Sequence, residues 1–540
     1  MDTDAIKRAI DLTYERKYDE AEKIYKSLLA ENPNDVILLS AVGLFYVSTR
    51  KYEDAVNYLK QACDIKETLG TVSALGFAQY ENKNYEEASL TLERALTFGE
   101  NADIYNKLIL SLFEIRNFKK AKAYTEKMCE LYPDNPKTIA NKIKSLTQTG
   151  ELIEAEKICV EYLKQNPNSG PMWHHLGLLK ELMYCDDKSA IECYKLAGEN
   201  GNAATDYNIA VCFQKMGKYK EAEDYYKNFL KLFPNNEEAI TSLGMCYLSQ
   251  KKFCEGYELF YKRSKGSLDK YTSNLWKPSE TPDKDLVIIC DQGFGDHIQF
   301  IRYLPFFDCK SVKVAAAKSL IKLFKLNYPN YEFIKYSEIN PEIQAVRVAD
   351  LAYFLNMDFN NIPFSEGYLN VEPANITNKK LKVGLCWEAG AAGIRGMINR
   401  TINVRCFEPI LNMKDIQVYS FQYNDVLKGN ERYPQMINLA KDFNDFYDTA
   451  KALKSMDIMI TVDTSVAHLA GALGVKTLLL LPYAPDWRWF RGCPEKEGED
   501  ITSWYKSVKL IVQQDHISWE EPINIVKQIL NSIISSHKGL

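Results

Sequence analysis

The first half of the chain carries a hydrophobic pattern that returns about every 34 residues. A large aromatic or aliphatic residue is followed three positions later by a small one, as in Tyr18 and Ala21. The small residues recur in steps of 32 to 35, with Ala190 filling the one gap: Ala21, Ala55, Ala88, Ala121, Ala155, Ala190, Ala222 and Gly256. A glycine precedes four of them by 12 or 13 positions: Gly43, Gly76, Gly177 and Gly244. Closely crossing helices need small residues at the contact, so each period predicts a pair of antiparallel helices.

The repeat period is lost between Ser264 and Asp285, where Ser, Lys, Pro and Asp dominate. This change in composition predicts a domain boundary. Beyond it, short apolar runs alternate with small-residue turns and helical patterns, which is typical of parallel sheets covered by helices. Strands are expected at 286–290, 382–387, 457–462 and 476–481; the turn 291–296 leads into a helix through Phe307, and a closing helix spans 519–535. We expect a helical array at 1–264, a linker at 265–284, and two α/β halves at 285–378 and 379–540.

Composition narrows the function classes. The net charge of −5 and the pI of about 5.9 argue against a dedicated nucleic-acid binder. Nine of the 14 arginines lie from Arg263 onward, and none lies between Arg116 and Arg263. Because the planar guanidinium of Arg can bind a phosphate through two hydrogen bonds, which Lys cannot, this asymmetry favours a phosphate-binding function in the second half.

Cysteine use and the N-terminus favour a cytoplasmic protein. The 13 cysteines include no Cys-x-x-Cys pair, which predicts reduced, buried thiols and neither a disulfide framework nor a zinc site. The first residues lack the basic-then-apolar order of a signal peptide. No run of 18 apolar residues exists, so no membrane span is expected.

The 34-residue period, with prolines at repeat ends, resembles tetratricopeptide repeats, about eight of them over residues 3–264. The resemblance implies a groove that binds a protein partner. Asn106, Asn141 and Asn208 fall on first helices, where they would contact a peptide backbone or be ordinary solvated positions. In the sequence Trp173-His174-His175, we expect Trp173 to pack in the core of its repeat. Metal binding is not expected, because the adjacent residues His174 and His175 face different directions on a helix.

Motifs in the second half resemble the tetratricopeptide-repeat glycosyltransferases of bacteria, whose catalytic part is similar to the ADP-heptose-using heptosyltransferases. The motifs are Gln-Gly-Phe-Gly-Asp-His-Ile-Gln-Phe-Ile-Arg-Tyr-Leu-Pro at 292–305, Ile362-Pro with Tyr368-Leu, 462–474 and 482–489. The resemblance covers essentially the whole chain. It implies a GT-B fold of two Rossmann-like domains with a cleft between them, and inverting sugar transfer without a metal.

Sugar transfer to a hydroxyl needs a base to accept its proton. Asp296 matches the position at which the family is thought to place that carboxylate. It also stands at the start of the predicted helix, where a carboxylate can serve as an N-cap. Both roles are open, and one residue can fill both.

The donor diphosphate needs positive charge and free N–H groups. Gly293 and Gly295 permit a sharp turn and close backbone approach, and Asp463, Thr464 and Ser465 open a helix at positions where the family binds donor phosphate and sugar. A structural cap is the alternative for the second group.

Two further residues would assist the donor. His468 would reach a phosphate or the nucleotide, or be a satisfied core histidine. Arg400, with Arg395 and Arg405 nearby, matches best the family's basic residue that neutralises the departing diphosphate, although the loop 388–399 departs from the family's polar pattern.

The remaining candidates are substrate contacts: Gln292, His297, Trp387, Asp486 and Arg488. Trp487 and Trp489 are as well explained by packing. The Asp-x-Asp pair of Asp283 and Asp285 lies in the linker, where a solvated loop is favoured over a metal site.

The leading hypothesis is therefore a metal-independent inverting glycosyltransferase that needs no cofactor. Its donor is a nucleotide sugar, and the repeats recruit a protein acceptor, for which a flagellin-like surface protein is favoured. The alternatives are a glycolipid or lipopolysaccharide acceptor, and an inactive repeat scaffold. ADP-heptose is suggested by the resemblance, but UDP-, GDP- and CMP-linked donors stay open.

Overall fold

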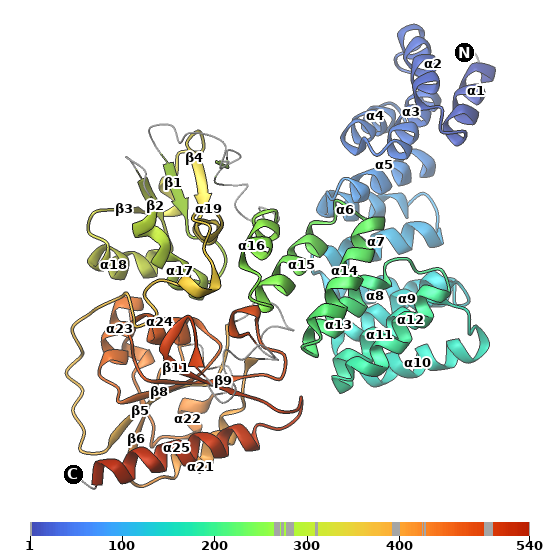
Figure 1. The fold of residues 1–540 in the computed structure, drawn as a ribbon. Coiled ribbons are helices and arrows are strands. Elements are labelled where there is room, and N and C mark those ends of the chain that lie inside the picture. Colours follow the sequence, from blue (N-terminus) through green and yellow to red (C-terminus); the bar gives the residue numbers. More distant parts are fainter. Residues whose placement is uncertain are drawn as a thin grey trace. The chain divides into compact units, whose positions relative to one another are not determined.

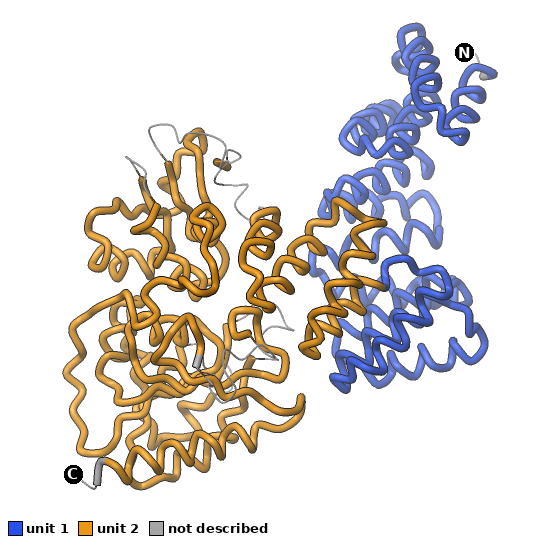
Figure 2. Tube along the Cα trace, viewed as in Figure 1, with its two compact units in different colours: residues 1–205 blue, residues 206–540 orange. Residues whose placement is uncertain are grey.

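A computed structural model describes residues 3–263, 271, 275–276, 286–307, 312–390, 400–423, 425, 428–490 and 501–538 (Figure 1). The contacts divide the chain into two compact units, residues 1–205 and 206–540 (Figure 2). The described part of the first unit is helical. The second unit holds further repeat helices and two sheets.

The first unit consists of consecutive helices, most of which pack on their neighbours in sequence. Their bounds are α1 Thr3–Tyr14, α2 Tyr18–Glu31, α3 Val36–Ser48, α4 Tyr52–Ile65, α5 Leu69–Glu81, α6 Tyr85–Ala95, α7 Ala102–Glu114, α8 Phe118–Leu131, α9 Pro136–Thr149, α10 Leu152–Gln165, α11 Gly170–Tyr184 and α12 Asp187–Glu199. Two helices per period confirm the predicted repeat.

The periodic small residues lie where these helices touch. All six alanines of the period in this unit, from Ala21 to Ala190, are fully buried. A Cβ at Gly43 would lie 2.4 Å from Cγ of Leu59, and one at Gly76 would lie 2.6 Å from Cγ of Leu92. Contacts this short leave no room for a methyl group, so close helix packing explains the periodic glycines.

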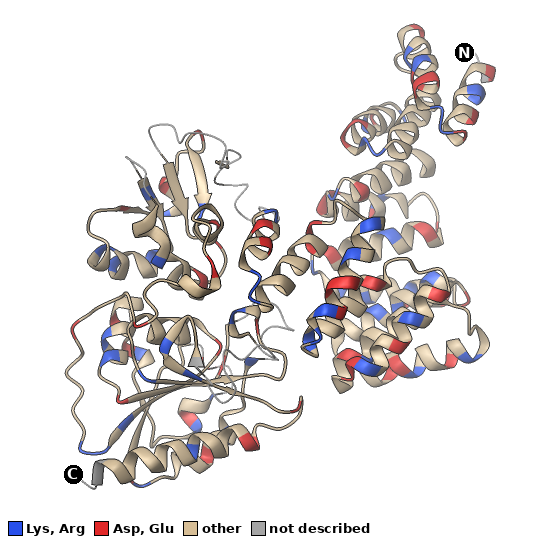
Figure 3. Ribbon diagram, viewed as in Figure 1, with Lys and Arg blue, Asp and Glu red and all other residues tan. Residues whose placement is uncertain are grey.

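Lys and Arg are interspersed with Asp and Glu along the repeat helices (Figure 3). Some of these residues pair with a neighbouring helix or turn, as in Lys107 Nζ with Glu81 Oε1 at 2.7 Å and Lys127 Nζ with Glu100 Oε1, in the turn before α7, at 2.9 Å. Exposed pairs of this kind contribute little to stability, so the packed small residues carry the repeat structure.

The repeat pattern continues into the second unit. The helices are α13 Thr205–Lys215, which starts one residue before the unit, α14 Tyr219–Leu232, α15 Glu237–Ser249 and α16 Phe253–Tyr261. Ala222 is fully buried, and a Cβ at Gly256 would lie 2.7 Å from Cγ of Leu248. Tetratricopeptide-type helices therefore extend over about 260 residues, as the period predicts.

The first sheet is parallel, with strand order β3-β2-β1-β4. Its strands are β1 Leu286–Ile289, β2 Val312–Ala315, β3 Glu332–Ile334 and β4 Gln344–Arg347; the helices with it are α17 Phe294–Phe300, α18 Lys318–Asn327 and α19 Leu351–Phe354, with 3₁₀ turns η2 Ile301–Phe306, η3 Tyr336–Glu338, η4 Val348–Asp350 and η5 Phe359–Asn361. The single helix expected through Phe307 is thus divided at Ile301. Pro305 lies in η2, and a proline has no N–H to continue an α-helix.

The second sheet has the order β10-β11-β9-β8-β5-β6-β7, with β10 antiparallel to β11 and the other pairs parallel. Its strands are β5 Leu381–Cys386, β6 Ile416–Ser420, β7 Ile437–Asn438, β8 Ile458–Val462, β9 Thr477–Leu481, β10 Ile501–Thr502 and β11 Tyr505–Val512. The helices are α21 Glu408–Leu411, α22 Gly429–Arg432, α23 Phe446–Lys454, α24 Ser465–Ala472 and α25 Glu520–Lys538, with 3₁₀ turns η6 Val404–Phe407, η7 Ala440–Asp442 and η8 Trp487–Trp489. The predicted strands correspond to β5, β8 and β9, and α25 is the predicted closing helix, with Ile523 and Val526 buried.

The last repeat helix is packed into the α/β region. Phe253 of α16 stacks on Trp504, with ring centroids 5.9 Å apart. Arg263, just after α16, donates to Asp350 at 2.5 Å and to Asp291 at 2.8 Å, and Arg347 donates to Asp350 at 2.6 Å. These four side chains are at most 8% exposed, so each charge depends on its partners.

Several sequence expectations fall outside the described residues, namely Asp283, Asp285, Arg395 and most of the linker 265–284. Within that linker, Trp276 is described, and its N–H donates to the carbonyl of Ala345 in β4 at 3.0 Å. Among the described helices, none is both long and apolar enough to cross a membrane.

Candidate functional site

The turn after β1 carries the predicted glycine motif. Its left-handed residue is Gln292, with φ of +69°, while the N-cap Gly293 has φ of −85°. Gly295 meets a different demand, since a Cβ there would lie 2.7 Å from Cδ2 of His468. The second glycine of the motif therefore lets α17 approach α24 closely.

Asp296 is the third residue of α17, and both of its carboxylate oxygens are engaged. Oδ2 accepts a hydrogen bond from the N–H of Gly293 at 3.0 Å, and Oδ1 accepts one from Nη2 of Arg488. Burial raises the pKa of Asp296; Arg488 lowers it and Asp486 adds to the rise. The capping role considered from the sequence is present, although it is exercised from the third helical position.

Arg488, in η8, connects the two α/β halves. Its Nε donates to Oε1 of Gln299 at 2.7 Å, its Nη1 donates to Oδ1 of Asp486 at 2.6 Å, and its Nη2 donates to Asp296. The side chain of Arg488 is only 11% exposed, and its Cζ lies 4.6 Å from the ring centroid of Trp487. The guanidinium of Arg488 is thus held by Asp486 of its own segment and by α17, which lies nearly 200 residues earlier in the sequence.

The segment after β8 begins α24. Thr464 is the N-cap, because its Oγ1 accepts from the N–H of Val466 at 3.3 Å and the helix begins at Ser465. Arg400 Nη1 donates to the carbonyl of Asp463 at 3.4 Å and lies 3.9 Å from its Oδ2. Burial, with a further contribution from Asp486, raises the pKa of Asp463 to about 6, while Arg400 opposes the rise. The predicted helix start is confirmed.

His468 lies between this segment and the turn after β1. Its Nδ1 is 3.0 Å from the hydroxyl of Tyr505, its Nε2 is 4.0 Å from Oδ1 of Asp463, and its ring stacks on Trp489. Burial, reinforced by Arg488, holds the pKa of His468 well below its usual value. The imidazole is therefore neutral, with one nitrogen satisfied by Tyr505.

These contacts define the motif cluster, by which we mean Asp296, Gln299, Asp463, His468, Asp486 and Arg488. Two residues predicted as substrate contacts, His297 and Trp387, are not part of this cluster. His297 is 2% exposed, neither ring nitrogen has a hydrogen-bond partner in the described structure, and burial lowers its pKa to about 4. Trp387 is fully buried, and its Nε1 donates to Glu388 at 2.9 Å.

Three residues at the cluster were not singled out from the sequence. Gln299 and Arg302 lie within the quoted motif, and Gln299 is one helical turn after Asp296, so helical spacing could have identified it. Arg302 is fully buried and donates to the carbonyls of Gln299 at 2.9 Å and Trp504 at 3.0 Å. Tyr505 comes from a separate strand, so sequence spacing carried no signal for it.

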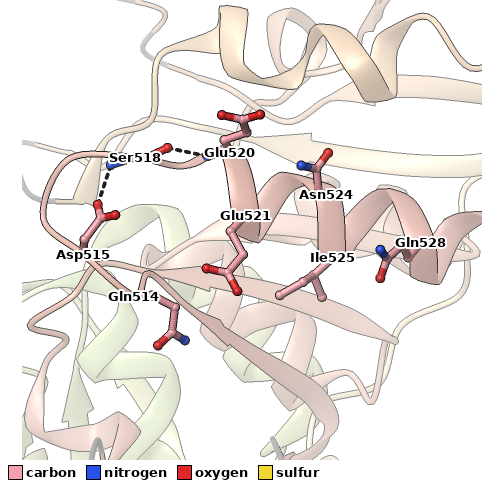
Figure 4. A pocket seen from close by; sticks show the side chains of 8 residues that line it. All are labelled: Gln514, Asp515, Ser518, Glu520, Glu521, Asn524, Ile525 and Gln528. Carbon is pink, nitrogen blue, oxygen red and sulfur yellow. Dashed lines mark hydrogen bonds between the residues drawn. The ribbon is translucent and has the colours of Figure 1, made fainter.

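A surface hollow of about 470 Å³ lies elsewhere, beside the start of α25 (Figure 4). Its lining residues are Gln514, Asp515, Ser518, Glu520, Glu521, Asn524, Ile525 and Gln528. Asp515 accepts from the N–H of Ser518 at 2.7 Å, and Ser518 accepts from the N–H of Glu520 at 3.1 Å. These bonds form the turn before α25, and this hollow contains none of the predicted site residues.

In the repeats, the predicted asparagines are partly engaged with one another. Asn141 of α9 is 3% exposed, and its Nδ2 donates to Oδ1 of Asn106 in α7 at 3.0 Å. A solvated position is therefore wrong for Asn141. Trp173 packs against the apolar core of its repeat and donates to the carbonyl of Pro167 at 2.7 Å, in agreement with the packing interpretation.

Comparisons with known proteins identify the repeats. Residues 207–236 match the family model described as tetratricopeptide repeat, and residues 15–95 match that of anaphase-promoting complex, cyclosome, subunit 3. The chain is 21% identical over 460 residues to Protein FlbA of Caulobacter vibrioides (strain ATCC 19089 / CIP 103742 / CB 15), covering 75% of this chain and 74% of that protein. The chain thus has tetratricopeptide repeats in its N-terminal region and a homologue at low identity.

Solved structures also resemble part of the chain. A tetratricopeptide repeat protein from Parabacteroides merdae ATCC 43184 is 14% identical with a TM-score of 0.42, over 45% of this chain and 97% of that one. Yeast Tom70 is 17% identical with a TM-score of 0.40, over 47% of this chain and 57% of that one.

Proposed function

We propose that the chain is a metal-independent inverting glycosyltransferase of GT-B type. It would move a sugar from a nucleotide-sugar donor to a hydroxyl or amide of a protein acceptor, of flagellin-like class, recruited by the repeats. One observation carries the proposal: the segments around Asp296, Asp463 and Arg488, which resemble transferase motifs, meet in a single, largely buried cluster.

The cluster supplies the groups that such a reaction needs. Asp296 would accept the proton of the acceptor hydroxyl as the bond from that oxygen to the sugar forms. The bond from the sugar to the diphosphate breaks in the same displacement, which inverts the anomeric carbon. Arg400, Arg488 and the N–H groups at the start of α24 would stabilise the charge that develops on the diphosphate.

The repeats support a protein acceptor. Repeats of this kind generally mediate protein–protein interaction, and stacked helix pairs offer an extended surface for a polypeptide. The sugar and the nucleotide are open, with ADP-heptose suggested by the resemblance in the catalytic region.

The test uses the purified chain with a panel of ADP-, UDP-, GDP- and CMP-sugars, and measures release of the nucleotide and labelling of surface proteins. Asp296→Asn should lower the rate by at least about 100-fold, because it removes the base while keeping the side-chain shape. The control is Asp445→Asn at the N-cap of α23, where Asn caps as well as Asp and the rate should stay the same.

A second candidate is an inactive scaffold with a glycosyltransferase-like region. It is favoured by the fact that both oxygens of Asp296 and three N–H groups of Arg488 already have structural partners. Absence of release with every donor, together with a lowered melting temperature in Asp296→Asn, would select this candidate over the transferase.

A further inference from the structure

Arg488 bonds directly to the carboxylate proposed as base, and its neighbour Trp489 stacks on His468 in the helix proposed to hold the diphosphate. A guanidinium has five N–H groups, and Gln299, Asp486 and Asp296 each accept from one of its three nitrogens. Among the described residues, one further N–H on each Nη has no acceptor, and an incoming anion could bind there first. The charge of Arg488 also acts on Asp463 and His468, at the start of α24.

Gln299 fixes the orientation of this fork. Its Oε1 accepts from Nε at 2.7 Å, and the side chain is fully buried in α17. With the Nε edge fixed, both Nη atoms point away from Gln299, one toward Asp486 and one toward Asp296. An anion that reaches these Nη groups from the start of α24 would draw on the same positive charge that Asp296 uses.

We propose that Arg488 couples donor binding to the release of the base: the diphosphate takes over N–H groups of Arg488 from Asp296 and frees that carboxylate to accept a proton. The inference rests on the proposed function and deepens it. The ligand chemistry is a diphosphate dianion or trianion, and the coupling is a change of hydrogen-bond partner with no covalent step.

The electrostatics of the cluster fit this exchange. The charged groups that act on Asp296 are Arg488 and Asp486 from the η8 segment and Asp291 after β1. Within this set only Arg488 is a cation, and it is the group that lowers the pKa of Asp296 against burial. When Arg488 is shared with an anion, the pKa of Asp296 rises, so binding should draw a proton onto the carboxylate.

Isothermal titration of the full chain with inorganic pyrophosphate, near pH 6 and in two buffers of different ionisation enthalpy, measures that proton. Wild type should take up more protons per site than Asp296→Asn, in which residue 296 cannot titrate. Equal uptake in these two proteins would overturn the inference while leaving the diphosphate site intact. Absence of pyrophosphate binding would overturn both the inference and the proposed donor site.

Arg488→Gln distinguishes the exchange of hydrogen-bond partners from the direct effect of the anion's charge on the pKa of Asp296. Without the arginine, Asp296 has no cation to lose, so the extra uptake should disappear at saturating pyrophosphate. Persistence of the wild-type uptake would assign it to the charge of the anion and overturn the inference. If Arg488→Gln lowers the melting temperature, both proteins are titrated at a temperature well below the unfolding transition of the variant.

Discussion

Asp463 illustrates how one residue's environment decides its chemistry. From the sequence it is a polar residue before a helix, which is compatible with a cap or a phosphate site. In the fold, Thr464 provides the cap, and Asp463 is 5% exposed with its pKa raised to about 6. Burial outweighs the attraction of Arg400, so the carboxyl titrates well above its usual range.

This raised pKa gives a pH prediction for stability. Folded Asp463 holds its proton more tightly than the unfolded chain does, so its contribution is full below pH 3.8 and is lost as pH rises through about 6. Relative to Asp463→Asn, wild type should lose on the order of 2 kcal/mol of unfolding free energy between pH 4 and 6. Urea titrations at several pH values measure it. Parallel pH profiles for the two proteins would contradict the raised pKa.

Gly295 gives a steric prediction at the same scale. A Cβ there would meet Cδ2 of His468 at 2.7 Å, and that ring is held by Tyr505 and Trp489. Gly295→Ala should therefore lower the unfolding free energy by about 1–3 kcal/mol. Gly390→Ala is the matched control, because no described atom lies within 4 Å and its effect should stay within about 0.5 kcal/mol. Equal effects in urea unfolding would refute the close contact.

Sequence reasoning reached some cluster residues and missed others for a physical reason. Asp296 and Asp463 each follow a strand and start a helix, which is a local pattern. Tyr505 contributes through a hydroxyl that meets His468 from another strand. No local spacing encodes a contact of that kind, because it depends on how strands are ordered in the sheet.

At the scale of elements, the repeat helices were predictable because their contacts are local. Each helix packs chiefly on its neighbour in sequence, so the small residues recur at the period of the fold. The strands β2, β3, β4, β6, β7, β10 and β11 were not predicted. Each is either two residues long or contains charged or polar residues, so none shows the continuous apolar run by which β1, β8 and β9 were recognised.

Two glycines of α5 test the packing role of the periodic residues. Gly76→Ala should destabilise the protein by about 1–3 kcal/mol, because its Cβ would lie 2.6 Å from the buried side chain of Leu92. Gly70→Ala, in the exposed first turn, should be neutral or stabilise by up to about 1 kcal/mol through helix propensity. Thermal unfolding followed by circular dichroism compares them, and a stabilising Gly76→Ala would disprove the tight contact.

At the scale of the molecule, the last repeat helix belongs with the α/β region. Arg263 was visible in the sequence as the end of the arginine-free stretch, but its partners were not. It pairs with Asp291 and Asp350, which lie 28 and 87 residues away. A fragment that begins at residue 265, where the sequence predicts the helical array to have ended, would lack both Arg263 and α16.

The prediction at this scale concerns adjacent residues. Arg263→Met should cost about 3–5 kcal/mol, because it leaves two carboxylates buried without this partner. Lys262→Met removes an ion pair whose side chains are 50% and 52% exposed, and it should cost less than about 1 kcal/mol. Denaturant unfolding of the full chain measures both, and similar losses would show that the buried ion group does not stabilise this packing.

The sequence by itself determined the repeat period, the change to alternating strand and helix patterns, and the segments that form the turns after β1 and β8. These features depend on residues close in the chain, where side-chain size and backbone preference act directly. Only the tertiary structure decided that Arg488 meets Asp296 across 192 residues and that α16 joins the α/β region. Those contacts depend on the order of strands in two sheets and on burial, which raises or lowers each pKa only after the chain has folded.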